Sequence, residues 1–179
     1  MNVFRKVLNL LLFLTSVCYP IFWFFAPNYK IVLSIILASL WLIKAPLSQG
    51  YFRYFAFFLG ALLLTLLGGQ VLELMTWYPA IVSGFMLIVF TSSLFSSQSF
   101  VERLARIQDP NLTPQGVIYT RRVTQVWCGF FILNILVITF CIWQKYWFFW
   151  ALYSGIISYL LMGLLFLGEW LVRRRILKQ

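Results

Sequence analysis

The sequence predicts an all-α membrane protein, in which six transmembrane helices form a bundle and both chain ends lie on the cytoplasmic side. Composition gives the first reason: 63% of the residues are apolar and only 10% are charged, whereas a soluble domain carries about 25% charged residues. The second reason is a series of six long apolar stretches, each suited to a bilayer. The third is that Lys and Arg fall at alternate ends of these stretches, as expected when basic loops stay cytoplasmic. We expect residues 1–179 to form a single transmembrane domain.

The first two helices are predicted at 7–25 and 27–44. The uninterrupted apolar core of the second, 31–43, spans only about 20 Å at a rise of 1.5 Å per residue, which is less than the roughly 30 Å of the hydrocarbon layer. An early start and the long side chains of Lys30 and Lys44, which reach outward to the headgroups, recover most of the difference. The charge pattern also requires this helix to cross, because otherwise the Arg-rich loop would lie outside.

The remaining helices are predicted at 51–67, 78–95, 125–143 and 147–167, and the polar segment 96–124 separates the fourth from the fifth. This assignment places 12 of the 14 basic residues on the cytoplasmic side. They are Arg5, Lys6, Lys44, Arg53, Arg103, Arg106, Arg121, Arg122, Arg173, Arg174, Arg175 and Lys178. The outer side then holds Lys30 and Lys145.

Aromatic and small residues fit the same arrangement. Tyr and Trp favour both membrane–water interfaces, because the ring prefers acyl chains and the polar atom prefers headgroups. We place Tyr29, Trp77, Tyr78, Tyr146 and Trp147 at outer helix ends, and Trp41, Tyr51, Trp127 and Trp170 at inner ends. Pairs of small residues four positions apart let helices approach closely, and they occur as Ala56/Gly60, Ala80/Gly84 and Ala151/Gly155.

The segment 96–124 contains a short amphipathic helix that we expect to lie along the cytoplasmic membrane surface. Ser99 and Glu102 form a capping box, which marks a helix start. Pro110 ends this helix, because the residue before a proline avoids helical geometry. Thr113 then caps a second start. The apolar residues that recur at helical spacing are Phe100, Leu104 and Ile107.

Four arginines lie within this short helix or after it in the same segment: Arg103, Arg106, Arg121 and Arg122. Two interpretations are open. They anchor the protein to the headgroups of an anionic cytoplasmic leaflet, or they form a docking site for an acidic partner or an anionic ligand. Nucleic acid is disfavoured as the partner, because no basic segment is long enough to form a groove-binding face.

Two polar residues inside apolar stretches are further candidates for function. Glu73 lies near the outer interface, where an ionisable group is solvated by headgroups or takes part in proton coupling or substrate contact. Asn134 lies at the centre of the fifth predicted helix, and its amide needs a partner in hydrocarbon. The sixth helix offers Ser154, Ser158 and Tyr159 at a comparable depth, so a bond between helices or a binding role is expected there.

Enzyme chemistry has little support in this sequence. Histidine, the commonest general base and zinc ligand, is absent. The cysteines, Cys18, Cys128 and Cys141, fit neither a disulfide framework nor a metal site. The acids, Glu73, Glu102, Asp109 and Glu169, show no fixed pairing. We therefore expect no metal, no cofactor and no catalytic residue, and an enzyme acting on an acyl chain is the least favoured function.

Several segments carry a family resemblance that covers roughly residues 73 to 175. The segments are Tyr78-Pro79, 100–106, Asp109-Pro110, 119–128, 159–163 and Gly168-Glu169. Together they resemble a family of small bacterial inner-membrane proteins encoded beside acyl-carrier proteins, ketosynthases and acyltransferases of aryl-polyene or other fatty-acid-like lipid pathways. The family has a second acid and further proline after Asp-Pro, where this chain has 111–114 (Asn-Leu-Thr-Pro). This difference argues against a metal or acid role for the turn.

The resemblance and the arginines together predict a non-catalytic accessory or scaffold component of a lipid or aryl-polyene biosynthetic assembly. The resemblance implies a location in the bacterial inner membrane and an acyl-carrier protein as the acidic partner of the arginine site. The alternative is a small lipid or metabolite transporter, in which Glu73 and Asn134 line a path between helices.

Overall fold

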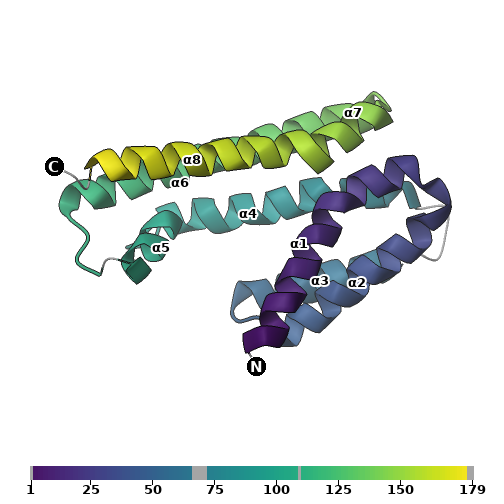
Figure 1. Cartoon of the computed structure of the whole chain (residues 1–179), viewed down its shortest axis with the longest axis horizontal. Coiled ribbons are helices and arrows are strands. Elements are labelled where there is room, and N and C mark those ends of the chain that lie inside the picture. Colours follow the sequence, from purple (N-terminus) through teal and green to yellow (C-terminus); the bar gives the residue numbers. More distant parts are fainter. Residues whose placement is uncertain (1, 66–71, 109, 177–179) are drawn as a thin grey trace. The chain divides into compact units, whose positions relative to one another are not determined.

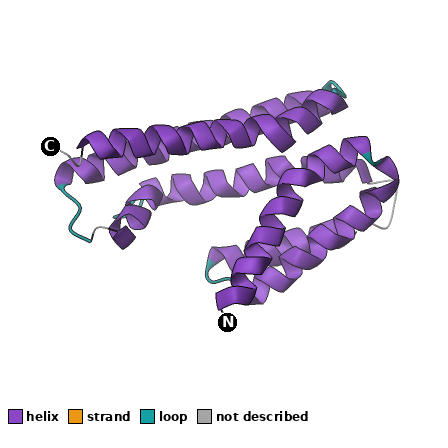
Figure 2. Cartoon of the chain, in the orientation of Figure 1, coloured by secondary structure: helices purple, strands orange, loops and turns teal. Residues whose placement is uncertain are grey.

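The computed structural model describes residues 2–65, 72–108 and 110–176, and every regular element in these ranges is helical (Figures 1 and 2). The α-helices are α1 (Asn2–Phe25), α2 (Lys30–Leu47), α3 (Tyr51–Thr65), α4 (Tyr78–Leu94), α5 (Phe100–Gln108), α6 (Pro114–Trp143), α7 (Trp147–Leu152) and α8 (Ser158–Ile176). Two 3-10 helices, η1 (Pro27–Tyr29) and η3 (Leu72–Trp77), and one π-helical turn, η4 (Tyr153–Ile157), join some of them. The predicted all-α class is confirmed.

Five helical stretches in the described part of the chain are long and apolar enough to cross a membrane: Val3–Phe25, Lys30–Leu47, Leu74–Leu94, Pro114–Trp143 and Trp147–Trp170. The short core of the second predicted helix therefore belongs to an 18-residue helix, about 27 Å long. The described part of α3 has 15 residues and spans about 22 Å. Its predicted continuation to residue 67 lies outside the described residues, so a sixth crossing stays a prediction.

The fifth predicted helix begins much earlier than its apolar stretch. We predicted a start at Gln125, whereas α6 is one helix from Pro114 to Trp143. Thr113 caps it as predicted, because its Oγ1 accepts the Gly116 N–H at 3.2 Å. The cap and the apolar stretch are therefore parts of the same helix, since no proline or glycine pair interrupts the polar residues between them.

The last predicted helix is also longer and less regular than expected. It begins at Trp147 as predicted, loosens into the π-helical turn η4, and continues as α8 to Ile176 rather than ending at Leu167. Gly155 lies in η4 at a close contact with α1, because a Cβ added there would stand 2.6 Å from the Ile21 side chain. Gly60 is close to α2 in the same way, and Gly84 has open space around it.

The chain forms two compact units. The first unit combines residues Met1–Tyr78 with Cys141–Tyr159, and the second combines Pro79–Phe140 with Leu160–Gln179. In the first unit, α2 packs along α3, and α1 packs on α2, α7 and η4. In the second unit, an aromatic core joins α4 to α6 through Phe90, Trp127, Cys128, Phe130 and Phe131.

Trp127, which we predicted at the inner membrane interface from its position near a helix end, is a buried residue of the second unit. It is buried in the aromatic core of the second unit, with its ring 6.1 Å from Phe90 and 4.7 Å from Phe166 of α8. Because α6 begins at Pro114, Trp127 lies well inside the helix and on the face that packs against α4 and α8.

Candidate functional site

A buried polar core occupies the first unit, built around η3. We define this polar core by Ser16, Tyr19, Ser34, Trp41, Met75, Thr76, Tyr78 and Trp150. η3 is short and tightly wound, and Pro79 follows it at the second position of α4. Met75, Thr76 and Tyr78 are all buried. Irregular backbone among apolar helices leaves carbonyl groups that need partners.

Side chains from two helices supply partners for these carbonyls, and a third helix contacts the Met75 side chain. The indole Nε1 of Trp150 on α7 donates to the Thr76 carbonyl at 3.1 Å. The hydroxyl of Tyr19 on α1 donates to the Met75 carbonyl at 3.4 Å. The Ser34 hydroxyl on α2 contacts the Met75 sulfur at 3.0 Å. η3 is therefore enclosed by helices that are distant in sequence, which fixes its path through the first unit.

Tyr78 joins two of these helices through one oxygen. Its hydroxyl lies 2.7 Å from the Ser16 Oγ on α1, and it accepts the Nε1–H of Trp41 on α2 at 3.1 Å. We predicted Tyr78 and Trp41 at opposite membrane interfaces, and this hydrogen bond shows that prediction to be wrong. The reason is that the Tyr78 side chain is buried inside the first unit, where its ring packs 5.3 Å from Tyr19.

Ser154 is the one described residue of the first unit whose buried hydroxyl oxygen has no hydrogen-bond partner. It lies in η4, where its carbonyl oxygen accepts the hydroxyl of Ser158 at 3.2 Å. A π-helical turn shifts the pairing of backbone groups and often occurs at functional positions. The Ser154 hydroxyl therefore makes no hydrogen bond to the described residues.

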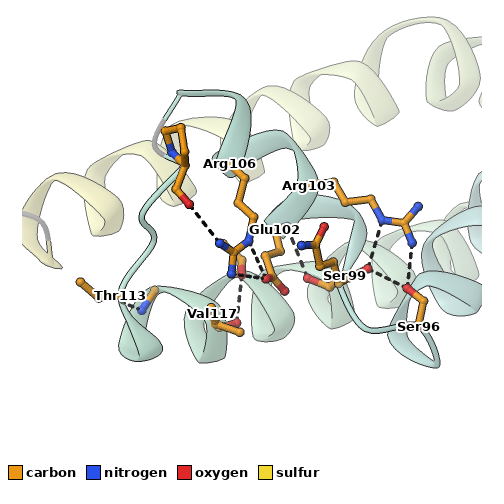
Figure 3. A network of polar contacts seen from close by, with 11 residues as sticks. Ser96, Ser99, Glu102, Arg103, Arg106, Thr113 and Val117 are labelled. Carbon is orange, nitrogen blue, oxygen red and sulfur yellow. Dashed lines mark hydrogen bonds and ion pairs between the residues drawn. The ribbon is translucent and has the colours of Figure 1, made fainter.

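The second unit carries the arginines at one end, around α5 (Figure 3). Ser99 caps the start of α5 as predicted, because its Oγ accepts the Glu102 N–H at 3.4 Å. The Glu102 carboxylate pairs with Arg106, so the described hydrogen bonds give the Ser99 half of the predicted capping box. Glu102 is only 3% exposed, and its carboxylate accepts Nε and Nη2 of Arg106, both at 2.9 Å. Arg106 also donates to the Pro110 carbonyl at 3.1 Å. Through these bonds, Arg106 ties the buried acid of α5 to the turn that follows the helix.

Two more of the four arginines bind the end of α4 and the turn between α4 and α5. Arg103 donates to the Ser96 Oγ at 2.8 Å and to the Gln98 carbonyl at 3.2 Å, and in Figure 3 it points away from Arg106. Arg121 donates to the carbonyl of Leu94, the last residue of α4, at 2.7 Å. Such bonds satisfy carbonyls that a helix end leaves free. Arg122 is exposed, and none of these bonds depends on it.

The end of α8 lies at the same end of the second unit as the start of α6. The Tyr119 hydroxyl on α6 donates to the Glu169 carbonyl on α8 at 3.1 Å. α8 runs on to Ile176 and so includes Arg173, Arg174 and Arg175, whose side chains are not among those described. The backbone of residues 173–175 is therefore helical. It extends from the end of the second unit where Arg121 and Arg122 lie.

The structure describes the side chain of one of the two further polar candidates, Asn134, and not that of the other, Glu73. Glu73 belongs to η3, but its side chain lies outside those described. Asn134 is buried in the second unit. Its predicted partners Ser154, Ser158 and Tyr159 belong to the first unit, so that pairing stays a prediction.

Metal-ligand chemistry finds no support in the described side chains. Among them, no group of three His, Cys, Asp or Glu lies close enough to hold a metal ion. Cys18, Cys128 and Cys141 are free thiols, and the last two are buried.

The polar core as a set was missed by the sequence reasoning. Ser16, Tyr19, Ser34 and Trp150 are single polar groups within apolar stretches, and each is common in membrane helices. The available signal was Tyr78-Pro79 at the start of an apolar stretch, which marks a break before α4. Irregular backbone among apolar helices requires polar partners nearby, and Tyr19 and Trp150 are those partners here.

Searches against protein-family models, curated proteins and solved structures found no match to this chain.

Proposed function

We propose that this chain is a six-span protein of the bacterial cytoplasmic membrane, with both ends in the cytoplasm. Two contacts support this topology. In the first unit, Lys44 Nζ donates to Asn9 Oδ1, so the start of α1 lies beside the end of α2. In the second unit, the Tyr119–Glu169 contact places the end of α8 beside the start of α6. Both contacts join segments that the distribution of basic residues assigns to the cytoplasmic side.

The function we propose is that of a non-catalytic accessory component of a lipid or aryl-polyene-type biosynthetic assembly. It binds an acidic soluble protein, of the acyl-carrier class, at the surface formed by Arg103, Arg106, Arg121 and Arg122. The supporting observation is that Glu102 is buried and already paired with Arg106, whereas Arg103, Arg121 and Arg122 are exposed. Unneutralised guanidinium groups attract carboxylate-rich surfaces and bind carboxylates with two hydrogen bonds.

Arg122 provides the cleanest test of this proposal. Reversing all four arginines would break the Glu102–Arg106 pair and the bonds of Arg103 and Arg121 to helix ends. Arg122→Glu leaves those contacts intact and reverses one exposed charge. We expect the variant to retain less of the pathway's acyl-carrier protein during co-purification in detergent, and Arg122→Lys to retain most of it. Equal retention by wild type and Arg122→Glu at low salt would reject acidic-partner binding at this surface.

A second candidate function is transport of a small lipid or metabolite. The observation that favours it is that Asn134 is a polar side chain buried in a long apolar helix, and polar residues inside membrane helices often mark substrate pathways. Glu73, next to the buried part of η3, would be the proton-coupling group. A Glu73→Gln protein that exports the pathway product normally would reject this candidate.

A further inference from the structure

α5 exposes its apolar residues and buries its acidic one. Leu104 is 51% exposed and Ile107 is 78% exposed, whereas Glu102 is 3% exposed. Ala105 beside Glu102 is also buried. A surface helix in water has the opposite arrangement, with its apolar stripe toward the protein and its charges outward. The outer side of α5 is therefore suited to an apolar environment.

Hydrogen bonds on the other side of α5 hold it in this orientation. Glu102 is bound to Arg106, and the Val101 N–H donates to Thr124 Oγ1 on α6 at 3.4 Å. Phe100 at the start of the helix packs 4.2 Å from the ring of Phe90 on α4. Turning Leu104 and Ile107 inward would break these contacts and expose Glu102, so the apolar side stays outward.

Other exposed apolar residues lie on the segments next to α5. Phe95, directly after α4, is 89% exposed, and Ile118 on α6 is also exposed. Arg103 is exposed on α5 itself, one position before Leu104, and Arg121 is exposed on α6. Among the described side chains of α5, the single carboxylate is neutralised by Arg106. Exposed apolar groups beside exposed cations match the boundary between acyl chains and lipid phosphates.

We propose that α5 is an in-plane membrane anchor in the cytoplasmic leaflet. Phe95, Leu104 and Ile107 insert among the acyl chains at the headgroup boundary. The occupant of this apolar side of α5 is the lipid leaflet. The inference rests on the proposed topology, which puts α5 on the cytoplasmic side, and it is independent of the acidic partner.

Two spin labels test the anchor, one at a position expected among acyl chains and one at a position expected in water. In a variant whose three cysteines are replaced by alanine, Ile107→Cys and Gln115→Cys are labelled separately, since Gln115 is exposed and polar on the first turn of α6. The protein is reconstituted into vesicles of phosphatidylcholine and phosphatidylglycerol without any other protein. We expect the label at 107 to collide more often with oxygen than with a water-soluble nickel chelate, and the label at 115 to show the reverse order. Equal exposure of both labels to the nickel chelate would overturn the anchor.

A second measurement avoids replacing the cysteines. Ile107→p-benzoylphenylalanine in the otherwise native chain should cross-link to phospholipid on illumination in the same vesicles, and Gln115→p-benzoylphenylalanine should not. Absence of the lipid adduct at 107 would also reject the proposal. Arg122→Glu should change neither result, so failure of the acidic-partner proposal is distinguishable from failure of the anchor.

Discussion

The Tyr78 hydroxyl connects α1, α2 and the start of α4. It accepts the indole N–H of Trp41 and shares a hydrogen bond with Ser16. Among apolar side chains, a donor that loses its acceptor has no water to replace it, and the desolvation penalty remains. A single oxygen therefore stabilises the approach of α1 and α2 to the residue that begins α4.

Removing that oxygen should destabilise the protein measurably. Tyr78→Phe keeps the ring and deletes the hydroxyl, so Trp41 Nε1 is left without its acceptor. We expect a loss of about 1–3 kcal/mol in the free energy of unfolding, measured by denaturation in detergent micelles. Tyr29→Phe is the matched control, because Tyr29 is exposed, and its midpoint should equal that of the wild type. Equal midpoints for both variants would contradict a structural role for the Tyr78 hydroxyl.

At the scale of elements, close packing depends on which face of a helix a glycine occupies. Gly60 and Gly155 lie at close contacts between helices, and Gly84 does not, although the Ala-x-x-x-Gly spacing is the same for all three. The spacing predicts that helices are able to approach, which is confirmed twice. It does not predict which faces meet, because the rotation of each helix is set by all the side chains packed around it.

Gly60→Ala and Gly84→Ala should therefore have different effects. Both replacements gain a similar amount of helix propensity. The added Cβ at position 60 would stand 2.7 Å from Leu42 Cγ and 3.1 Å from the Ala38 carbonyl oxygen. We expect Gly60→Ala to be less stable than Gly84→Ala by about 1–3 kcal/mol, the usual range for an overpacked site. Thermal unfolding in detergent checks this difference, and a Gly60→Ala protein as stable as Gly84→Ala would count against close contact of α2 and α3.

Helix boundaries show where sequence reasoning succeeds and where it fails. Thr113 and Ser99 were predicted as caps and are caps, because capping depends on residues within one turn. The start of α6 was misplaced at Gln125, because hydropathy marks the apolar part of a helix and not its polar continuation. The same reason explains why α8 extends to Ile176.

For the whole molecule, the proposed orientation in the membrane rests on the distribution of charge. Basic segments are held on the cytoplasmic side, and the contacts Lys44–Asn9 and Tyr119–Glu169 each join two such segments within one unit. The turn that carries Asn111 and the turn that carries Gln144 flank α6 and so lie at its opposite ends.

Thiol labelling measures this orientation directly. In the alanine-for-cysteine background, Gln144→Cys should react with a membrane-impermeant maleimide added to spheroplasts, because the turn after α6 faces outward. Asn111→Cys should react only in inverted membrane vesicles. Labelling of Asn111→Cys in sealed spheroplasts would overturn the topology, and with it the cytoplasmic position of the arginines and of α5.

The sequence by itself determined the helical class, the apolar stretches and the basic end of each stretch, because composition, capping and charge act over a few neighbouring residues. Only the tertiary structure decided that Tyr78 meets Ser16 and Trp41, residues 62 and 37 positions away. It also decided that α5 turns Glu102 inward and Ile107 outward. The physical reason is that these contacts depend on how helices rotate and pack against each other, and many weak side-chain contacts from distant segments set that rotation together.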